Sequence, residues 1–448
     1  MNEQFDLIII GAGPGGYETA AMAAHEGLNV ALVERDLLGG TCLNRGCIPT
    51  KALCASAGAV STLREAADWG ITIDGMNVDY AAAAARKDTV VKQLRDGVAM
   101  LMNDPHITVV QGTGRLIDAT TVAVDDRTLT APHIIIATGS SPASLPIEGA
   151  DKAINSDQLL AMTTLPASMC IVGGGVIGME FAAILNAYGV DVTVVEYCKE
   201  ILPPFDKDIA KRLRTVLSKR GINFAVGAAV KSITGEPGAL EVHYDSKGRD
   251  TIVTCEMVLM AVGRRAVLPE GLEAAGVTTG RRGIEVDDNM RTSAPSVYAI
   301  GDVNARCMLA HAATAQGRRA LAHIMHRDDA TRMDVVPSAV FTTPELAMVG
   351  LTEQQAADAG HELSVGKAFF RANGKAIAMG EPDGLVKIVV DKATRAILGC
   401  HICGPHAADL IQEIAVAMQA GLTVDTVKAT IHGHPTLGEV VATALASC

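Results

Sequence analysis

The sequence has no uninterrupted apolar run long enough to cross a bilayer, although 49% of its 448 residues are hydrophobic. Its start, MNEQFDLIII, has neither the basic residues nor the long apolar stretch of a signal peptide. Basic clusters are also scarce, because 38 lysines and arginines stand against 50 aspartates and glutamates and leave a net charge of −12. We therefore expect a cytoplasmic protein whose partners are neither membranes nor nucleic acids.

A disulfide framework is absent as well, because the ten cysteines are scattered and cytoplasmic thiols stay reduced. Most are expected to be small core residues. Cys400 and Cys403 form a CxxC, but they fall in an expected strand, where side chains three apart point to opposite faces, so no metal site is predicted. Cys42 and Cys47 lie in GGTCLNRGCIPTKALC (39–54). A redox dithiol at a helix start suits this pair better than a zinc knuckle, because helix amides lower a thiol pKa.

A repeated segment organises the chain. Residues 9–34 and 171–196 align without a gap at an offset of 162, with eleven identities in 26 positions. Each copy runs from an apolar strand through GxGxxG into a helix and a second strand that ends in Glu. Such glycines let the backbone approach a pyrophosphate at the helix start, and the acid accepts hydrogen bonds from a ribose. One GxGxxG is a weak signal, but two in full context predict two nucleotide-binding domains and two cofactors.

The two copies differ in the length of chain after their acids. Glu34 and Gly139 are 105 residues apart, whereas Glu196 and Gly263 are 67 apart, so the first copy carries 38 extra residues, in which the cysteine stretch begins. The strand SVYAIGDV (296–303) and the helical segment after it are expected to return to the first nucleotide domain. From about residue 336 the pattern changes to antiparallel strands and helices of a separate domain.

Several motifs together resemble the pyridine nucleotide disulfide oxidoreductases over essentially the whole chain. They are GGTCLNRGCIPTKAL, both nucleotide motifs, AIGDV, VFTTPELAMVGLTE (340–353) and HGHPTLGE (432–439). The resemblance implies an α/β fold with two Rossmann-like dinucleotide-binding domains, for FAD and NAD, and an α+β C-terminal dimerisation domain. The expected boundaries are 1–147 for the FAD domain, 148–267 for the NAD domain, 268–335 for the return to the FAD domain and 336–448 for the dimerisation domain.

The resemblance also implies an activity and a set of partners. The protein is expected to be a homodimer that oxidises protein-bound dihydrolipoamide to lipoamide and reduces NAD to NADH through a Cys42–Cys47 redox disulfide and FAD. Its expected partner is the lipoylated carrier of a 2-oxo-acid dehydrogenase or glycine cleavage complex.

Cofactor-binding residues are implied by the same resemblance. Those for FAD are Gly11, Gly13, Gly16, Glu34, Arg35, Thr41, Lys51, Gly114, Gly139, Asp302 and Ala310. Those for NAD are Gly173, Gly174, Gly175, Val176, Ile177, Gly178, Glu196, Val230 and Gly263. Lys51 is expected near the reactive flavin nitrogen with Glu180 as its ion partner. Glu196 would repel a 2′-phosphate and no arginine comes directly after it, which favours NAD over NADP.

The resemblance also assigns the catalytic roles. Cys42 is the interchange thiol that attacks the substrate, Cys47 faces the flavin, and His434 is the acid-base, oriented by Glu439 and supplied by the opposite subunit. Thiol exchange needs a base and an acid, and imidazole titrates in the right range. His432 is expected to be structural.

One residue departs from the family pattern. Arg45 stands between the cysteines, where the family usually has an apolar residue. This permanent cation either lowers a thiol pKa or points to solvent, and we favour solvent.

Three alternatives stay open. A glutathione-type reductase is disfavoured by the HxHPT pattern and Glu196, and a mercuric reductase by the lack of a terminal vicinal cysteine pair, although Cys448 ends the chain. A different class is a flavoprotein that serves mainly as a docking subunit of a large complex, but the sequence shows no docking element.

Overall fold

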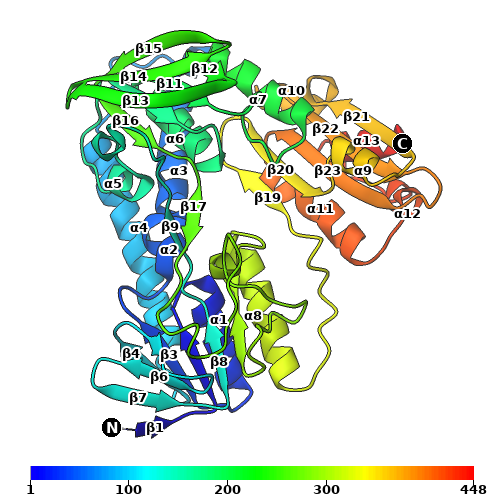
Figure 1. Cartoon of the computed structure of the whole chain (residues 1–448). Coiled ribbons are helices and arrows are strands. Elements are labelled where there is room, and N and C mark those ends of the chain that lie inside the picture. The colour runs from blue at the N-terminus through cyan, green and yellow to red at the C-terminus, as the bar shows by residue number, and fades with distance from the viewer. Residues whose placement is uncertain (1) are drawn as a thin grey trace. The chain divides into compact units, whose positions relative to one another are not determined.

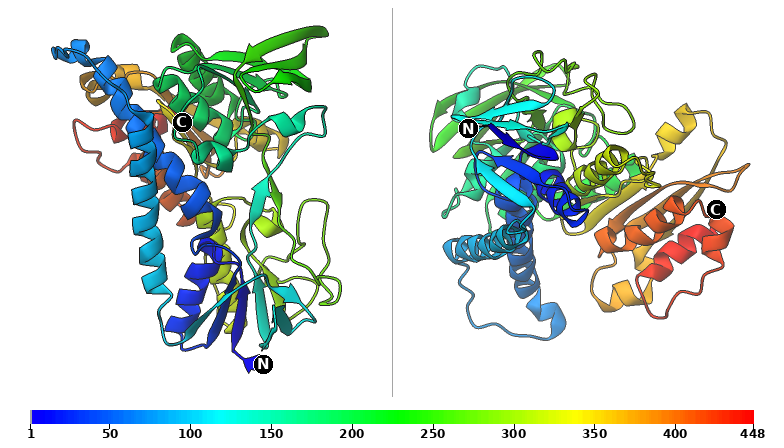
Figure 2. Two further views of the ribbon diagram at one scale, coloured as in Figure 1. Left: turned by 90° about the vertical axis from the view of Figure 1, so that its left-hand side faces the viewer. Right: turned by 90° about the horizontal axis from the view of Figure 1, so that it is seen from below.

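The computed structural model describes residues 2–448 (Figures 1 and 2). The chain divides into two compact units, each built from three segments. The first unit comprises the segment that ends at Ala52, together with Ala84–Ala143 and Arg264–Met333. The second comprises Leu53–Ala83, Ser144–Gly263 and Asp334–Cys448. The predicted division into domains is finer than this, and its boundaries stay a prediction. No helix within residues 2–448 is long and apolar enough to cross a membrane.

The first unit is built on a parallel five-stranded sheet of order β18-β8-β2-β3-β4. Its strands are short and fully apolar runs such as LIII and VALVE, as expected for a sheet that is covered on both faces. The strands are β2 (Leu7–Ile10), β3 (Val30–Glu34), β4 (Ile107–Gln111), β8 (His133–Ile136) and β18 (Val297–Ala299).

Two layers cover this sheet. Leu7 and Ile9 pack on one face against α1 (Pro14–His25) and α8 (Ala310–Ile324), which lie against each other (Figure 1). Ile8 and Ile10 point the other way, because strand side chains alternate, and pack against a second sheet of order β1-β7-β6-β5. The strands of that sheet are β1 (Asn2–Gln4), β5 (Arg115–Leu116), β6 (Thr121–Val124) and β7 (Arg127–Thr130).

Further elements carry the cysteines and the connections between the sheets. The cysteine stretch forms α2 (Gly40–Arg45) and the start of α3 (Cys47–Arg64), and α4 (Tyr80–Leu101) leads back to β4. A two-stranded antiparallel ribbon joins β9 (Ser140–Pro142) to β17 (Arg264–Ala266). The short turn η3 (Gly301–Asn304) lies between β18 and α8.

The second unit repeats the three-layer arrangement. Its parallel sheet has the order β12-β11-β10-β16, with Met169 and Ile171 packed with α6 and Cys170 and Val172 packed with an antiparallel sheet β13-β14-β15. The parallel strands are β10 (Ser168–Val172), β11 (Asp191–Glu196), β12 (Asn223–Val226) and β16 (Met257–Met260); the antiparallel ones are β13 (Ala228–Glu236), β14 (Ala239–Ser246) and β15 (Arg249–Cys255); the helices are α5 (Ser156–Leu160), α6 (Val176–Ala187) and α7 (Lys207–Lys219).

The same unit contains an antiparallel sheet of order β19-β20-β23-β22-β21. Helices α11 and α13 lie on one of its faces (Figure 2). Cys400 belongs to the core on that face and Cys403 to the core on the other, which confirms that this CxxC pair points in opposite directions. The elements are β19 (Ser338–Val340), β20 (Glu345–Gly350), β21 (Leu363–Phe369), β22 (Leu385–Asp391), β23 (Ile397–Gly404), α9 (Glu353–Asp358), α10 (Gly374–Ala378), α11 (Ala407–Gln419), α12 (Val424–Lys428) and α13 (Gly438–Ala446).

Candidate active site

The first glycine of each repeated turn is required by the backbone. Gly11 and Gly173 have φ of +106° and +108°, a region that L side chains rarely adopt. A Cβ at Gly11 would lie 2.4 Å from the carbonyl oxygen of Ala137, and one at Gly173 would lie 2.5 Å from that of Ala261. The third glycines, Gly16 and Gly178, are also required; a Cβ there would lie 1.8 and 2.1 Å from the carbonyl oxygens of the first glycines.

The second glycine of each turn has no such requirement from the protein. A Cβ at Gly13 would have its nearest neighbour at 4.0 Å, and one at Gly175 would have none within 4 Å. These residues are the N-caps of α1 and α6, with matching backbone angles, and neither has a side-chain cap. Each turn therefore presents an open backbone surface at a helix start, which fits the approach of a pyrophosphate group.

The acid that ends each repeat accepts hydrogen bonds from two backbone amides, which occupy equivalent positions in the two copies. Glu34 accepts hydrogen bonds from the amides of Ala12 at 2.7 Å and Asp36 at 2.8 Å. Glu196 accepts them from Gly174 at 2.5 Å and Cys198 at 2.6 Å, which are the equivalent positions 162 residues later. A carboxylate has about four acceptor sites, so each acid keeps capacity for ribose hydroxyls. Sequence reasoning predicted the ribose contact but missed the bonds that fasten each acid to its own turn.

The two cysteines that are predicted to be redox-active are brought together by Gly46. A Cβ at this position would lie 2.9 Å from the carbonyl oxygen of Thr41 and 3.3 Å from the Cα of Cys42. Only glycine therefore allows the chain to fold back between α2 and α3. The side chain of Cys42 is half-buried and that of Cys47 is exposed, and the two sulfurs are not joined in a disulfide. A hydrogen bond between the two side chains, together with burial, raises the pKa of Cys42, and the positive charge of Lys51 opposes the rise.

Arg45 has a partner that neither sequence alternative considered. Its guanidinium forms an ion pair with Asp36, the residue whose amide binds Glu34. The side chain of Arg45 is 40% exposed, so the expectation that it points to solvent describes it only in part. This ion pair connects the cysteine stretch to the first acid.

His434 and Glu439 form the predicted pair. His434 Nδ1 lies 2.9 Å from Glu439 Oε1, and Glu439 Oε2 accepts a hydrogen bond from the Thr436 amide at 2.8 Å. The Thr436 amide and then the imidazole lower the pKa of Glu439. The side chain of His434 is 81% exposed, so Nε2 faces outward with its lone pair available when Nδ1 carries the proton.

His432 differs from His434 in its surroundings. Its side chain is only 12% exposed, with Nε2 at 2.9 Å from Glu413 Oε1 and Nδ1 at 3.1 Å from the carbonyl oxygen of Thr430. Both ring nitrogens are engaged, which agrees with the structural role expected for it.

Other residues that are predicted to bind FAD belong to the first unit. Asp302 belongs to η3 and Ala310 begins α8. Asp302 accepts a hydrogen bond from Ser140, which itself accepts one from Arg264. Neither partner was predicted from the sequence. The one available signal was that Ser140 and Arg264 each directly follow a glycine, in ATGSSP and AVGRRA. Gly114 lies close to β2, because a Cβ built at this position would lie 3.0 Å from Ile10 Cγ2; its predicted contact with FAD stays a prediction. For Arg35 and Thr41 the structure adds no contact that supports their predicted role.

The predicted residues of the second unit lie on separate elements. Glu180, on α6, is buried and accepts a hydrogen bond from the Phe341 amide at 3.0 Å. Lys51 belongs to the other unit, so the Lys51–Glu180 pair stays a prediction. Val230 lies in β13 beside a bulge. Gly263 in this unit, like Gly139 in the first unit, has a positive φ and open space where a Cβ would stand.

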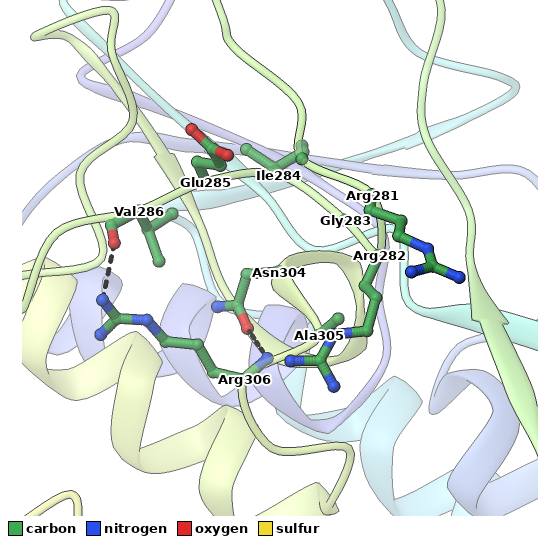
Figure 3. A pocket seen from close by; sticks show the side chains of 10 residues that line it. Arg281, Arg282, Gly283, Ile284, Glu285, Val286, Asn304, Ala305 and Arg306 are labelled. Carbon is green, nitrogen blue, oxygen red and sulfur yellow. Dashed lines mark hydrogen bonds between the residues drawn. The ribbon is translucent and has the colours of Figure 1, made fainter.

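A pocket of about 880 Å³ opens in the first unit between residues 280–286 and 304–306. Arg281, Arg282 and Arg306 line it together with Glu285 (Figure 3). Arg306 donates to the carbonyl oxygen of Val286 at 2.6 Å. The residues that line this pocket include none of those singled out from the sequence.

Comparison with protein families bears directly on this geometry. The model described as "Pyridine nucleotide-disulphide oxidoreductase" matches residues 5–317, and the model of the corresponding dimerisation domain matches residues 336–445. The chain belongs to the pyridine nucleotide-disulphide oxidoreductases. FAD and NAD are the cofactors, and the two open glycine turns with their acids fit two dinucleotides. The dimerisation domain supports a homodimer.

Individual relatives are similar over nearly their whole length. A dihydrolipoyl dehydrogenase of Chlamydia muridarum is 44% identical over 449 residues, covering 98% of this chain and 96% of the relative. One of Bacillus subtilis is 40% identical over 464 residues, covering 98% and 97%. Among solved structures, a Cu(II) complex of the HOCl-induced flavoprotein disulfide reductase RclA from Escherichia coli has a TM-score of 0.88 at 29% identity, covering 100% of this chain and 99% of that one. The α/β fold with its C-terminal dimerisation domain is thereby confirmed.

Proposed function

We propose that the protein is a dihydrolipoyl dehydrogenase, which oxidises protein-bound dihydrolipoamide to lipoamide and reduces NAD to NADH. The observation that carries this proposal is the pair of hydrogen-bonded thiols of Cys42, in α2, and Cys47, the first residue of α3. The 44% identity to a dihydrolipoyl dehydrogenase supports the choice of substrate.

Thiol exchange between the substrate and the cysteine pair balances without another reactant. In the oxidised enzyme a substrate thiolate attacks the Cys42 sulfur, the Cys42–Cys47 bond breaks, and Cys47 leaves as a thiolate. The second substrate thiol then attacks the substrate sulfur that is bonded to Cys42, which forms the lipoamide disulfide and releases the Cys42 thiolate. One S–S bond is broken and one is formed, and the enzyme gains two electrons. Bound FAD supplies the transfer of this electron pair from the cysteines to NAD.

His434 moves the proton in this scheme. Glu439 accepts a hydrogen bond from Nδ1–H and so fixes the orientation of the ring, which leaves Nε2 to take the proton of the incoming substrate thiol. In the dimer we assign this pair to the cysteines of the opposite subunit.

The nucleotide-binding assignments complete the proposal. The pyrophosphate and ribose of FAD are bound by Gly11, Gly13, Gly16 and Glu34, with further contacts from Arg35, Thr41, Lys51, Gly114, Gly139, Asp302 and Ala310. Residues Gly173 to Gly178, Glu196, Val230 and Gly263 bind NAD, with Glu180 paired to Lys51. The proposed location is the cytoplasm and the proposed partner a lipoylated carrier protein, which a pull-down with a lipoylated carrier domain tests.

The cysteine assignment is tested by an anaerobic assay of NADH formation from dihydrolipoamide. Cys42→Ser and Cys47→Ser should each lower turnover to background, because neither variant can form the disulfide. Cys54→Ser, on the same helix, is the matched control and should keep near-normal turnover. A Cys47→Ser enzyme with near-normal turnover would refute the scheme. The same assay with reduced glutathione, mercuric ion and NADP separates this activity from the related ones.

A further inference from the structure

Three side chains near the start of the two-stranded ribbon form a hydrogen-bonded chain. Arg264 Nε lies 2.7 Å from Ser140 Oγ, and Arg264 Nη2 lies 2.7 Å from the Ser140 carbonyl oxygen. Ser140 Oγ lies 2.5 Å from Asp302 Oδ2. Ser140 is only 8% exposed, so its polar atoms depend on these partners.

The direction of this chain is fixed by chemistry. A guanidinium can only donate, so Ser140 Oγ must accept from Arg264. The hydroxyl has a single proton, which is therefore directed to Asp302 Oδ2. Arg264 determines in this way that the serine donates to the aspartate.

One oxygen of Asp302 is left over. Within the described part of the chain, the side chain of Asp302 forms a hydrogen bond through Oδ2, and Oδ1 has no hydrogen-bonding partner. The backbone of η3 is held by other groups, since Gln316 Oε1 accepts from the Gly301 amide at 2.7 Å and from Asn304 Nδ2 at 2.9 Å. The position of η3 and the orientation of the Asp302 carboxylate are thus controlled by different residues.

The ribbon explains how residues 124 positions apart meet. Strands β9 and β17 are antiparallel, with Arg264 opposite Pro142 and Ala266 opposite Ser140. Arg264 and Ser140 are therefore diagonal neighbours, within reach of a long side chain. The chain leaves the first unit after Ala143 and returns to it at Arg264. Arg264 thus fastens the incoming strand to the outgoing one.

We propose that Arg264 and Ser140 are positioning residues for FAD: they orient Asp302 so that Oδ1 accepts a hydrogen bond from a hydroxyl group of the cofactor. This inference rests on the proposed assignment of Asp302 to FAD. It adds two residues to the flavin site that neither contribute to the glycine turn nor take part in thiol chemistry.

The first test measures the dissociation constant of FAD from the recovery of flavin fluorescence on dilution of the holoenzyme. Ser140→Ala and Arg264→Met should raise it by about tenfold or more, because a charge-assisted network is broken. Arg264→Lys should also weaken FAD binding, because a lysine offers one nitrogen where the guanidinium uses two to bind Ser140. Ser140→Thr keeps the hydroxyl and should stay within about twofold. Arg265→Met, at the exposed neighbouring position of the same ribbon, is the matched control and should also stay within about twofold.

A double-mutant cycle tests whether Ser140 acts through Asp302. Asp302→Ala should weaken FAD binding. Adding Ser140→Ala should weaken it no further, because the carboxylate that Ser140 orients is already gone. Additive losses, or Ser140→Ala and Arg264→Lys variants that bind FAD like the wild type, would overturn the inference. An Asp302→Ala variant with unchanged FAD affinity would overturn both the inference and the assignment of Asp302. These measurements use no substrate, so their outcome is separate from the dihydrolipoamide assay.

Discussion

His434 and His432 show at the scale of single residues how surroundings decide a role. The two lie two positions apart in HGHPT, and each imidazole contacts a glutamate at 2.9 Å. His432 uses both ring nitrogens and is largely buried, whereas His434 keeps Nε2 free to exchange a proton. Only His434 is therefore equipped for acid-base chemistry.

Replacement of His434 tests this difference. His434→Gln should lower turnover of dihydrolipoamide by about a hundred- to ten-thousandfold, because the substrate thiol loses its base. His432→Gln, the control, should lower it less than tenfold. Steady-state turnover with saturating NAD is the measurement, and a loss below tenfold in His434→Gln would reassign the base.

Glycine and cysteine positions were the most predictable residues of the site. Their roles depend on local backbone and on spacing of a few positions, which a sequence shows directly. The partners Asp36 of Arg45 and Asp302 of Ser140 were not predictable, because they lie 9 and 162 residues away and meet only after the sheets have formed. The same holds for Arg264, whose contact depends on the register of β9 and β17.

At the scale of secondary-structure elements, an ion cluster around a buried lysine joins α7 and α9 to β22. Lys387 Nζ, fully buried, lies 2.9 Å from both carboxylate oxygens of Asp206 and from Asp208 Oδ2, and 2.6 Å from Glu353 Oε2. Asp206 also N-caps α7 through the amide of Asp208. Although burial opposes ionisation, the bond to Lys387 lowers the pKa of Asp206.

Removal of the lysine should be costly. Lys387→Met leaves Asp206, only 2% exposed, without its counter-charge and should lower the free energy of unfolding by about 3–5 kcal/mol. Lys392→Met is the control, since Lys392 and Glu362 form an ion pair with side chains 60% and 74% exposed, and it should cost less than about 1 kcal/mol. Urea unfolding of the holoenzyme measures both; equal effects would contradict the account.

The same cluster predicts a dependence on pH. Burial favours the neutral form of Asp208, but bonds from Lys367 and Lys387 outweigh it and lower its pKa from 3.8 to about 2. The stabilisation from this carboxylate is therefore present above about pH 4 and is lost as the pH falls towards 2. The wild type should lose more stability than Asp208→Asn over this interval. Thermal unfolding midpoints at a series of pH values measure the difference, and parallel curves would contradict it.

At the scale of the whole molecule, the strand, glycine turn, helix and second strand of each nucleotide-binding fold were predictable from the repeat. The second sheet that packs against each parallel sheet was not, because the repeat does not include its strands. The antiparallel character of the C-terminal sheet was predictable from alternating strands joined by short turns. The division into two units of three segments each was not, because the cysteine helix α3 passes from one unit to the other within an unbroken helical sequence.

The proposed exchange of catalytic residues between subunits can be tested on the dimer. A heterodimer of one Cys42→Ser subunit and one His434→Gln subunit contains an intact site only if cysteines and histidine come from opposite subunits. Such a heterodimer, purified with two different tags, should keep about half of the wild-type turnover, because one of two sites is complete. Both homodimers serve as inactive controls. An inactive heterodimer would place each cysteine pair and its histidine in the same subunit.

The hydrogen bonds that Glu34 and Glu196 accept from backbone amides have a consequence for how nucleotides associate with the protein. Each acid ties its glycine turn to the end of the neighbouring strand by a hydrogen bond, which restrains the loop in the protein alone. The conformational entropy of the loop is therefore lost during folding and does not have to be lost again on association. Both dinucleotides meet preorganised sites, and their affinities depend on direct contacts rather than on ordering of the loops.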